Sequence, residues 1–107
     1  MPVFTSNSAS LDMDIRNTWE TGLVVDFLLS PDQALNGWTV EFEYSGEIVN
    51  IWNGQVISRT GDRYVVQNVG YNAEIAAGAS TGFGFQGSGA SHTITPIAIA
   101  GEAVGGG

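Results

Sequence analysis

Hydrophobic and polar residues alternate along much of this chain, and this period of two is the feature that most limits its fold. Over residues 38–44, Trp38, Val40, Phe42 and Tyr44 occupy one set of positions, and Thr39, Glu41 and Glu43 occupy the other. A period of two is typical of a half-buried strand, whereas an amphipathic helix repeats every ~3.6 residues. Similar alternation recurs at residues 11–15, 82–86 and 93–99. The pattern therefore predicts strands.

Runs rich in Val, Ile and Leu predict further strands at residues 23–29, 47–52, 55–59 and 63–67, of the more buried kind. Turn-forming pairs separate them, among them Asn36-Gly37, Asn53-Gly54 and Val69-Gly70. Short strands with turns about every 8–12 residues are typical of a sandwich or barrel. The sequence thus predicts an all-β fold: a single-domain antiparallel β-sandwich of immunoglobulin-like size. One short helical turn is expected at 31–35.

The ends of the chain differ from its middle. Residues 1–10 are expected to be an N-terminal lead-in, residues 11–101 the sandwich, and residues 102–107 the start of a glycine-rich linker. This composition suggests that the domain was joined to another one in its parent protein. The first residues lack the basic segment followed by an apolar one that marks a secretory signal.

Charge and composition exclude several functions. Eleven acidic residues against three basic ones give a net charge of −8, which opposes binding to nucleic acid or to anionic membranes. The absence of cysteine excludes disulfides, thiolate zinc sites and cysteine nucleophiles. A single histidine, His92, makes a multi-histidine metal site impossible within one chain. We therefore expect no metal and no cofactor, although Asp12 and Asp14 leave a structural ion as an alternative.

The large aromatic residues fall into two groups. Trp38 follows the strand alternation and is predicted to be buried, as are Phe27, Phe83 and Phe85. Trp19, Trp52 and Tyr71 instead have amide, hydroxyl or carboxylate neighbours. They either cap the ends of the sandwich, half-buried, or project outward as an aromatic patch. Such a patch usually marks a binding surface, and with amides around it would suit a sugar, whose apolar face stacks on an aromatic ring.

These aromatics belong to five short motifs that occur in a fixed order over most of the chain. The motifs are Asn17-x-Trp19-x-x-Gly22, Asn36-Gly37-Trp38-Thr39-Val40, Ile51-Trp52-Asn53, Tyr71-Asn72-Ala73-x-Ile75, and Ala77-Gly78-x-Ser80-Thr81-x-Phe83-Gly84-Phe85-Gln86-Gly87. In this order and spacing the chain resembles a family 2 carbohydrate-binding module, the bacterial cellulose-binding type. The resemblance implies an antiparallel sandwich with one flat face.

Carried over position by position, the resemblance also implies a binding site. Three aromatics of the family that stack on sugars of crystalline cellulose match Trp19, Trp52 and Tyr71. Its polar contacts match Asn17, Asp26, Asn50 and Gln86, and its buried tryptophan matches Trp38. This chain departs from the family in having no terminal disulfide, a tyrosine as the third aromatic, Asp26 in place of an amide, and Gly82 at a polar position.

The function expected from sequence is therefore non-catalytic adsorption to an insoluble β-1,4-linked polysaccharide. Cellulose is expected first, chitin second, and xylan less. Glu41 and Glu43 fit a solvated sheet face better than a catalytic pair, and no nucleophile motif accompanies His92. We further expect an extracellular monomer, linked in cis to a catalytic domain. The alternative is an immunoglobulin-like adhesion or protein-interaction domain that uses the same exposed aromatics.

Overall fold

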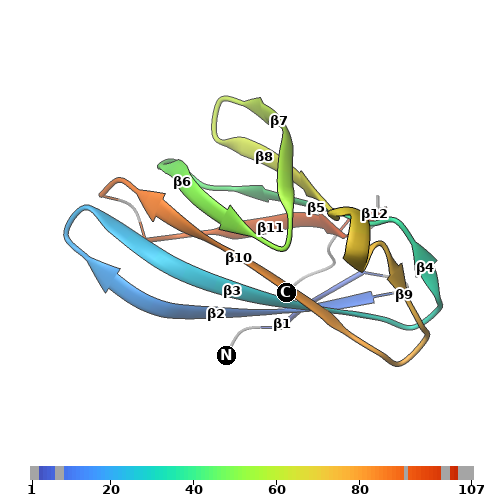
Figure 1. Ribbon diagram of the computed structural model, residues 1–107. Helices are drawn as coiled ribbons and strands as arrows, with labels where there is room; N and C mark the ends of the chain where they lie inside the picture. The colour runs from blue at the N-terminus through green and yellow to red at the C-terminus, as the bar shows by residue number, and fades with distance from the viewer. Residues whose placement is uncertain (1–2, 7–8, 91, 100–101, 104–107) are drawn as a thin grey trace.

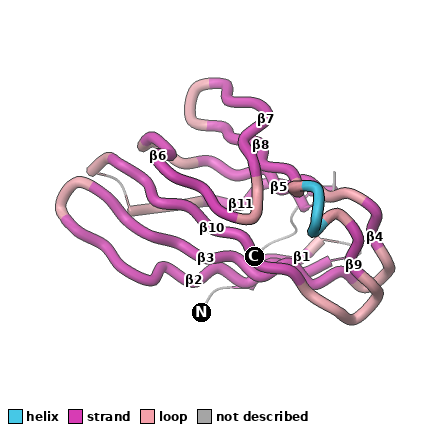
Figure 2. Tube along the Cα trace, viewed as in Figure 1, coloured by secondary structure: helices cyan, strands magenta, loops and turns pink. Residues whose placement is uncertain are grey.

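The protein is a β-sandwich in which two five-stranded antiparallel sheets face each other (Figure 1). The computed structural model describes residues 3–6, 9–90, 92–99 and 102–103. Strands make up most of the described chain, and its one helical segment is the short 3-10 turn η1 (Gly70–Asn72) (Figure 2). The all-β, single-domain prediction is confirmed. None of the described helical structure is long and apolar enough to cross a membrane.

The first sheet has the strand order β1-β2-β3-β10-β6. Its strands are β1 (Val3–Thr5), β2 (Ala9–Trp19), β3 (Gly22–Pro31), β10 (Thr81–Ser88) and β6 (Glu47–Trp52). Strands β2 and β3 form a long hairpin, and β10 lies between β3 and β6. The first sheet therefore gathers segments from both halves of the sequence.

The second sheet has the order β12-β11-β5-β8-β7. Its strands are β12 (Glu102–Ala103), β11 (Thr95–Ile99), β5 (Thr39–Glu43), β8 (Arg63–Gln67) and β7 (Gln55–Thr60). A two-stranded sheet of β4 (Leu35–Asn36) and β9 (Glu74–Ile75) closes one end of the molecule. Strand β6 lies at one edge of the first sheet and β7 at one edge of the second, and they follow each other in the chain, so the turn between them joins the two sheets.

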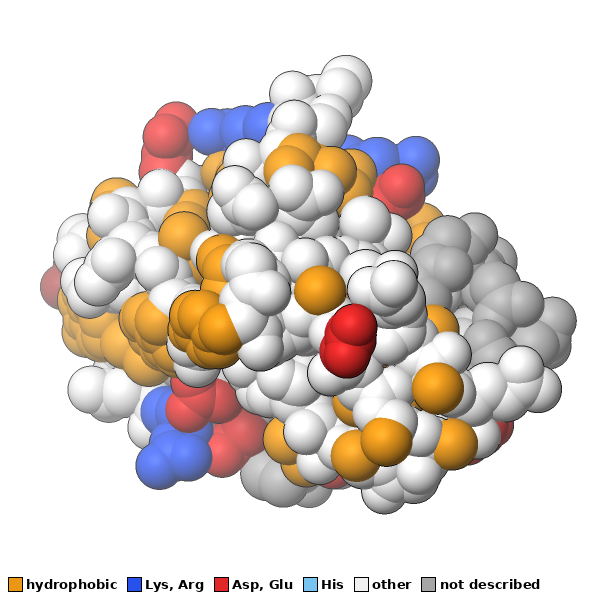
Figure 3. Space-filling model, turned by 45° about the vertical axis from the view of Figure 1, so that its right-hand side comes forward, with side chains coloured by type: hydrophobic (Ala, Val, Ile, Leu, Met, Phe, Trp, Pro, Cys, Tyr) orange, Lys and Arg blue, Asp and Glu red, His pale blue; other side chains and the backbone are white. Residues whose placement is uncertain are grey.

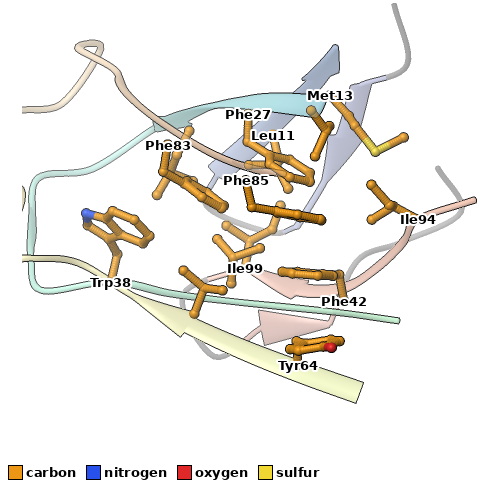
Figure 4. Close-up of a cluster of buried hydrophobic side chains, with 14 of the residues drawn as sticks. Leu11, Met13, Phe27, Trp38, Phe42, Tyr64, Phe83, Phe85, Ile94 and Ile99 are labelled. Carbon is orange, nitrogen blue, oxygen red and sulfur yellow. The ribbon is translucent and has the colours of Figure 1, made fainter. Parts of the chain in front are cut away.

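Aromatic rings fill the space between the sheets (Figure 4). Phe85 of the first sheet stacks on Phe42 of the second, with 5.4 Å between ring centroids. Trp38 is only 3% exposed, and its ring lies 5.3 Å from that of Phe83. The predictions that Trp38, Phe27, Phe83 and Phe85 are buried are confirmed. Because the chain has no disulfide, these contacts must hold the sheets together.

Two buried tyrosines complete this core on the side of the second sheet. The Tyr64 hydroxyl donates a hydrogen bond to the Gly46 carbonyl oxygen at 2.9 Å. Burial raises the pKa of both Tyr44 and Tyr64, because the charged phenolate is poorly solvated there. Both rings therefore stay uncharged at neutral pH and pack as large apolar groups.

Three local predictions differ from the structure. The helical turn expected at 31–35 is wrong, since Pro31 ends β3 and Leu35 pairs with Ile75 in β4. The expectation that β6 and β7 are strands of the more buried kind is also wrong, because both lie at a sheet edge: all six residues of β7 are exposed, and β6 has no fully buried residue. The apolar run at 23–29 is buried on one face only, and Leu28 on its other face is 42% exposed.

The expected domain boundaries fall close to short strands. Strand β1 lies within the expected lead-in 1–10 and pairs with β2, where Val3 lies opposite Asp12. Strand β12 lies within the expected linker 102–107 and pairs with β11. Residues 104–107, the rest of that expected linker, lie outside the described residues. The boundaries drawn from the sequence stay predictions.

Candidate functional site

The outward side chains of the first sheet form three rows that run across β2, β3, β10 and β6. Residues in a row are cross-strand partners. The rows are Trp19–Gly22–Ser88–Glu47, Asn17–Val24–Gln86–Asn50 and Asp14–Asp26–Gly84–Trp52. Phe85, between the second and third rows, and the pair Phe27 and Phe83, just beyond the third row, turn inward. We call the surface made by these three rows the outer face.

Trp19 lies at one corner of the outer face, at the end of β2, and is 37% exposed. Its cross-strand partner is Gly22. A Cβ atom added at Gly22 would lie 2.7 Å from both Cε2 and Cζ2 of the indole, closer than side chains approach in practice. The ring therefore lies down over the backbone of Gly22, and only glycine leaves space for it. The backbone carbonyl oxygen of Trp19 accepts a hydrogen bond from His92 Nε2 at 2.6 Å.

Trp52 lies at the opposite corner, at the end of β6, and is held in the same way. Its partner is Gly84, where an added Cβ would lie 2.7 Å from the indole Nε1. The indole N–H reaches across Gly84 and donates a hydrogen bond to Asp26 Oδ1 of β3 at 3.2 Å. The ring therefore spans β10 along the sheet surface. With ordinary strand rise and spacing, the Cα atoms of Trp19 and Trp52 lie about 20 Å apart.

Asp26 also belongs to a small charge cluster on the outer face. Arg16 Nη1 lies 3.6 Å from Asp26 Oδ2 and 3.4 Å from Asp14 Oδ2. These side chains are substantially exposed, so their pairing adds little stability. Its effect is to orient the Asp26 carboxylate, which in turn fixes the edge of the Trp52 ring. Figure 3 shows acidic and basic side chains side by side at the lower edge of the view.

Tyr71, the third predicted aromatic, belongs to η1 and is 77% exposed. Its hydroxyl donates a hydrogen bond to Oδ1 of Asn53, the residue after Trp52. Asn53 has a φ of +61°, a left-handed conformation that asparagine tolerates better than most residues. Its backbone carbonyl oxygen also accepts a hydrogen bond from Asn72 Nδ2 at 2.7 Å. Two hydrogen bonds thus place Tyr71 beside the end of β6.

The structure brings together the residues that sequence reasoning selected. Asn17, Gln86 and Asn50 share the middle row of the outer face; Asn17 and Asn50 are exposed and Gln86 is half-buried. The sequence did not predict that Gly22 and Gly84 underlie the rings, nor the contacts of Arg16 and Asn53. The Asn53-Gly54 pair predicted the turn after β6. Only the register between paired strands shows which glycine lies under which ring.

Other groups considered for chemistry lie apart from one another. In the described ranges, no three His, Cys, Asp or Glu side chains are grouped so that they could hold a metal ion. Glu41 and Glu43 belong to β5 of the second sheet, and Glu41 lies 3.9 Å from Arg63. What the outer face offers is two indoles lying on the sheet, a tyrosine at its border, and amides between them. Together with the fold, this surface defines the class: a β-sandwich binding module.

Comparison with known proteins gives the family. The family model described as "Cellulose binding domain" matches residues 9–104, nearly the whole chain. The chain therefore belongs to the cellulose-binding domain family, and the resemblance inferred from its motifs is confirmed.

Individual relatives agree with this assignment. Endoglucanase A of Thermobispora bispora is 36% identical over 85 residues, which cover 76% of this chain and 18% of the relative. Chitinase C of Streptomyces lividans is 32% identical over 92 residues, covering 82% of this chain and 15% of the relative. The chain thus spans less than a fifth of the length of these two enzymes.

A solved structure extends the comparison to the fold. The solution structure of a chitin-binding domain from Streptomyces coelicolor superposes with a TM-score of 0.64 and 31% identity, covering 86% of this chain and 88% of that one. Here the match spans nearly the whole of both chains, so the relative is a separate domain of similar extent.

Proposed function

We propose that this domain adsorbs to insoluble β-1,4-linked polysaccharide, cellulose or chitin, through the outer face of its first sheet. The observation that carries the proposal is the placement of Trp19 and Trp52 over Gly22 and Gly84. An indole that lies down on a sheet turns a ring face to the solvent, and a ring face is what the apolar side of a pyranose stacks on. Asn17, Asn50, Gln86 and Asp26 lie between the rings, where they can pair with sugar hydroxyl groups.

The spacing of the rings favours an extended ligand. Two rings whose Cα atoms lie about 20 Å apart, at opposite corners of the outer face, reach several sugars of one chain, or neighbouring chains of a solid surface. Tyr71, held beside Trp52 by Asn53, would add a third stacking position. By analogy with base stacking on aromatic side chains, each ring would contribute about 1–3 kcal/mol. Several weak contacts then add up without a deep pocket.

The relatives support a proposal about the setting of the domain. In the endoglucanase and the chitinase the matched segment is a small part of a longer protein. We propose that this domain likewise acts without catalysis, as an extracellular monomer linked in cis to an enzyme. Holding that enzyme on its substrate would raise the effective concentration of the polymer chain.

A pull-down with insoluble polymers tests this function. The purified domain is mixed with microcrystalline cellulose, chitin or insoluble xylan, and the protein left in the supernatant is measured. We expect depletion by cellulose, by chitin, or by both, and less by xylan. A domain that stays in solution with all three would contradict the proposal and favour a protein-interaction role for the same aromatics.

A further inference from the structure

A hollow of about 320 Å³ opens on the first sheet beside Trp52. Its lining includes Asp14, Arg16, Asp26, Leu28, Trp52 and Gly82. Ligand pockets for small molecules measure roughly 300–1,000 Å³, so this hollow is at the small end of that range. It suits a substituent of a larger ligand better than a whole oligosaccharide.

The hollow exists because β10 carries no side chain at this point of the sheet. Gly82 of β10 lies opposite Leu28 of β3 and contributes no side chain. Its neighbours in the lining, Phe27 and Phe83, turn their rings into the core, so they contribute backbone to the floor. The pairing of β10 with β6 ends at Gly84 and Trp52, so β6 does not extend alongside Gly82, which lies two residues earlier in β10. The hollow is therefore an open step in the surface, bounded on one side by the Trp52 indole.

The walls of the hollow combine apolar and polar groups. Leu28 is 42% exposed and lines the hollow together with the Trp52 indole, so it forms an apolar wall. Arg16 supplies guanidinium donors, and both of its ion pairs use Nη1, so the donors on its other nitrogens can face a ligand. Asp14 and Asp26 supply carboxylate acceptors. A ligand group that matches these walls has a small apolar end, one acceptor and one N–H donor.

We propose that this hollow receives the acetamido group of a β-1,4-linked N-acetylglucosamine chain whose sugar ring stacks on Trp52. The acetamido methyl would contact Leu28, its carbonyl oxygen would accept from Arg16, and its N–H would donate to a carboxylate. An equatorial substituent projects from the edge of a pyranose, so a sugar lying on the indole places it over the adjacent step. This inference rests on the proposed function and assigns chitin a contact that cellulose, with a hydroxyl at that carbon, does not make.

Filling the hollow tests the proposal. A Cβ atom at Gly82 would lie 3.4 Å from its nearest neighbour, the Phe27 carbonyl oxygen, and Gly82 does not have a positive φ. Gly82→Gln is therefore tolerated by the backbone and places its side chain in the hollow. We expect its affinity for chitin to fall about tenfold, with affinity for cellulose unchanged or higher. Ser58→Gln, on the exposed strand β7 of the second sheet, is the matched control and should bind both polymers as the wild type does.

A second variant removes a wall instead of filling the space. Leu28→Ser takes away the contact for the acetamido methyl and should lower chitin affinity several-fold while cellulose affinity is kept. Thermal melts of the variants verify folding. Equal loss on both polymers, or no loss on chitin in either variant, would overturn the inference.

Binding of the wild-type domain to cellulose and to chitin distinguishes a failure of this inference from a failure of the proposed function. Wild-type binding to cellulose but not to chitin would refute the acetamido site and leave the proposed function standing. Wild-type binding to neither polymer would overturn both.

Discussion

Trp38 and Trp52 are the same kind of side chain held by two different means. Trp38 lies between the sheets, stacks on Phe83, and donates its indole N–H to the Asn72 carbonyl oxygen at 2.8 Å. Trp52 lies on the outer face, covers Gly84, and donates its N–H to a partly exposed carboxylate. Burial fixes the first ring, whereas a missing side chain and one hydrogen bond fix the second. The interior therefore supplies stability, and the outer face supplies orientation.

Strand β10 shows the same division within eight residues. Its inward positions include Phe83 and Phe85, which are almost completely buried and stack in the core. Its outward positions are Gly82, Gly84, Gln86 and Ser88, and the two glycines leave room for the hollow and for the Trp52 indole. With phenylalanines on its inward face and glycines on its outward face, β10 packs the core of the sandwich and leaves space on the outer surface of the first sheet.

The strongest test of this comparison is stability. Trp38→Ala removes a buried indole and its hydrogen bond, and we expect the free energy of unfolding to fall by about 3–5 kcal/mol. For Trp19→Ala and Trp52→Ala we expect less than about 1 kcal/mol, because both rings lie at the surface. Urea denaturation followed by circular dichroism measures all three. A loss of about 3 kcal/mol or more in either surface variant would place that ring in the core instead.

The second test is binding. Trp19→Ala and Trp52→Ala should each lower affinity for the polysaccharide that the wild type binds by about 5–150-fold, the equivalent of roughly 1–3 kcal/mol. Trp52→Phe keeps a ring over Gly84 and should retain more of the affinity. Adsorption isotherms measure the change. Unchanged isotherms for both alanine variants would show that these rings do not contact the polymer.

A smaller effect is expected from the group that orients Trp52. Asp26→Ala removes the acceptor for the indole N–H, and a net hydrogen bond of about 0.5–1.5 kcal/mol corresponds to a roughly two- to tenfold loss of affinity. Asp26→Asn keeps an acceptor oxygen and should lose less. If the two variants bind equally, the hydrogen bond does not set the position of the ring. Adsorption isotherms with chemical denaturation in parallel separate lost binding from lost folding.

Alternation in the sequence was enough to predict the sandwich and most of its core. The period of two at residues 38–44 correctly predicted which side chains are buried, because side-chain direction in a strand depends only on local geometry. Exposure of strand β7 could not be predicted in this way, since it follows from the place of the strand at a sheet edge. The helical turn expected at 31–35 failed for a related reason: Leu35 pairs with a residue 40 positions further along the chain.

The candidate site was predictable in its residues but not in its geometry. Motif order selected Trp19, Trp52 and Tyr71, but ring orientation depends on which residue lies across the strand. Gly84 underlies Trp52 only because β10 and β6 pair in that register. The hollow at Gly82 likewise depends on where the pairing of β6 with β10 ends. Such long-range register is not encoded in any one segment.

The exposed edge strand β7 matters for how many copies can share a surface. Molecules held on a solid polymer stand closer together than molecules in solution, and an open strand edge is where a neighbour would add its own strand. On β7, Arg59 Nη1 lies 3.2 Å from Glu47 Oε1 of β6, and the guanidinium group covers the Tyr64 ring. A charged side chain on an edge strand disfavours pairing with a strand of another copy. The net charge of −8 adds repulsion between neighbours. Dense layers of this domain should therefore resist aggregation, despite the open hydrogen-bonding edge that each copy carries.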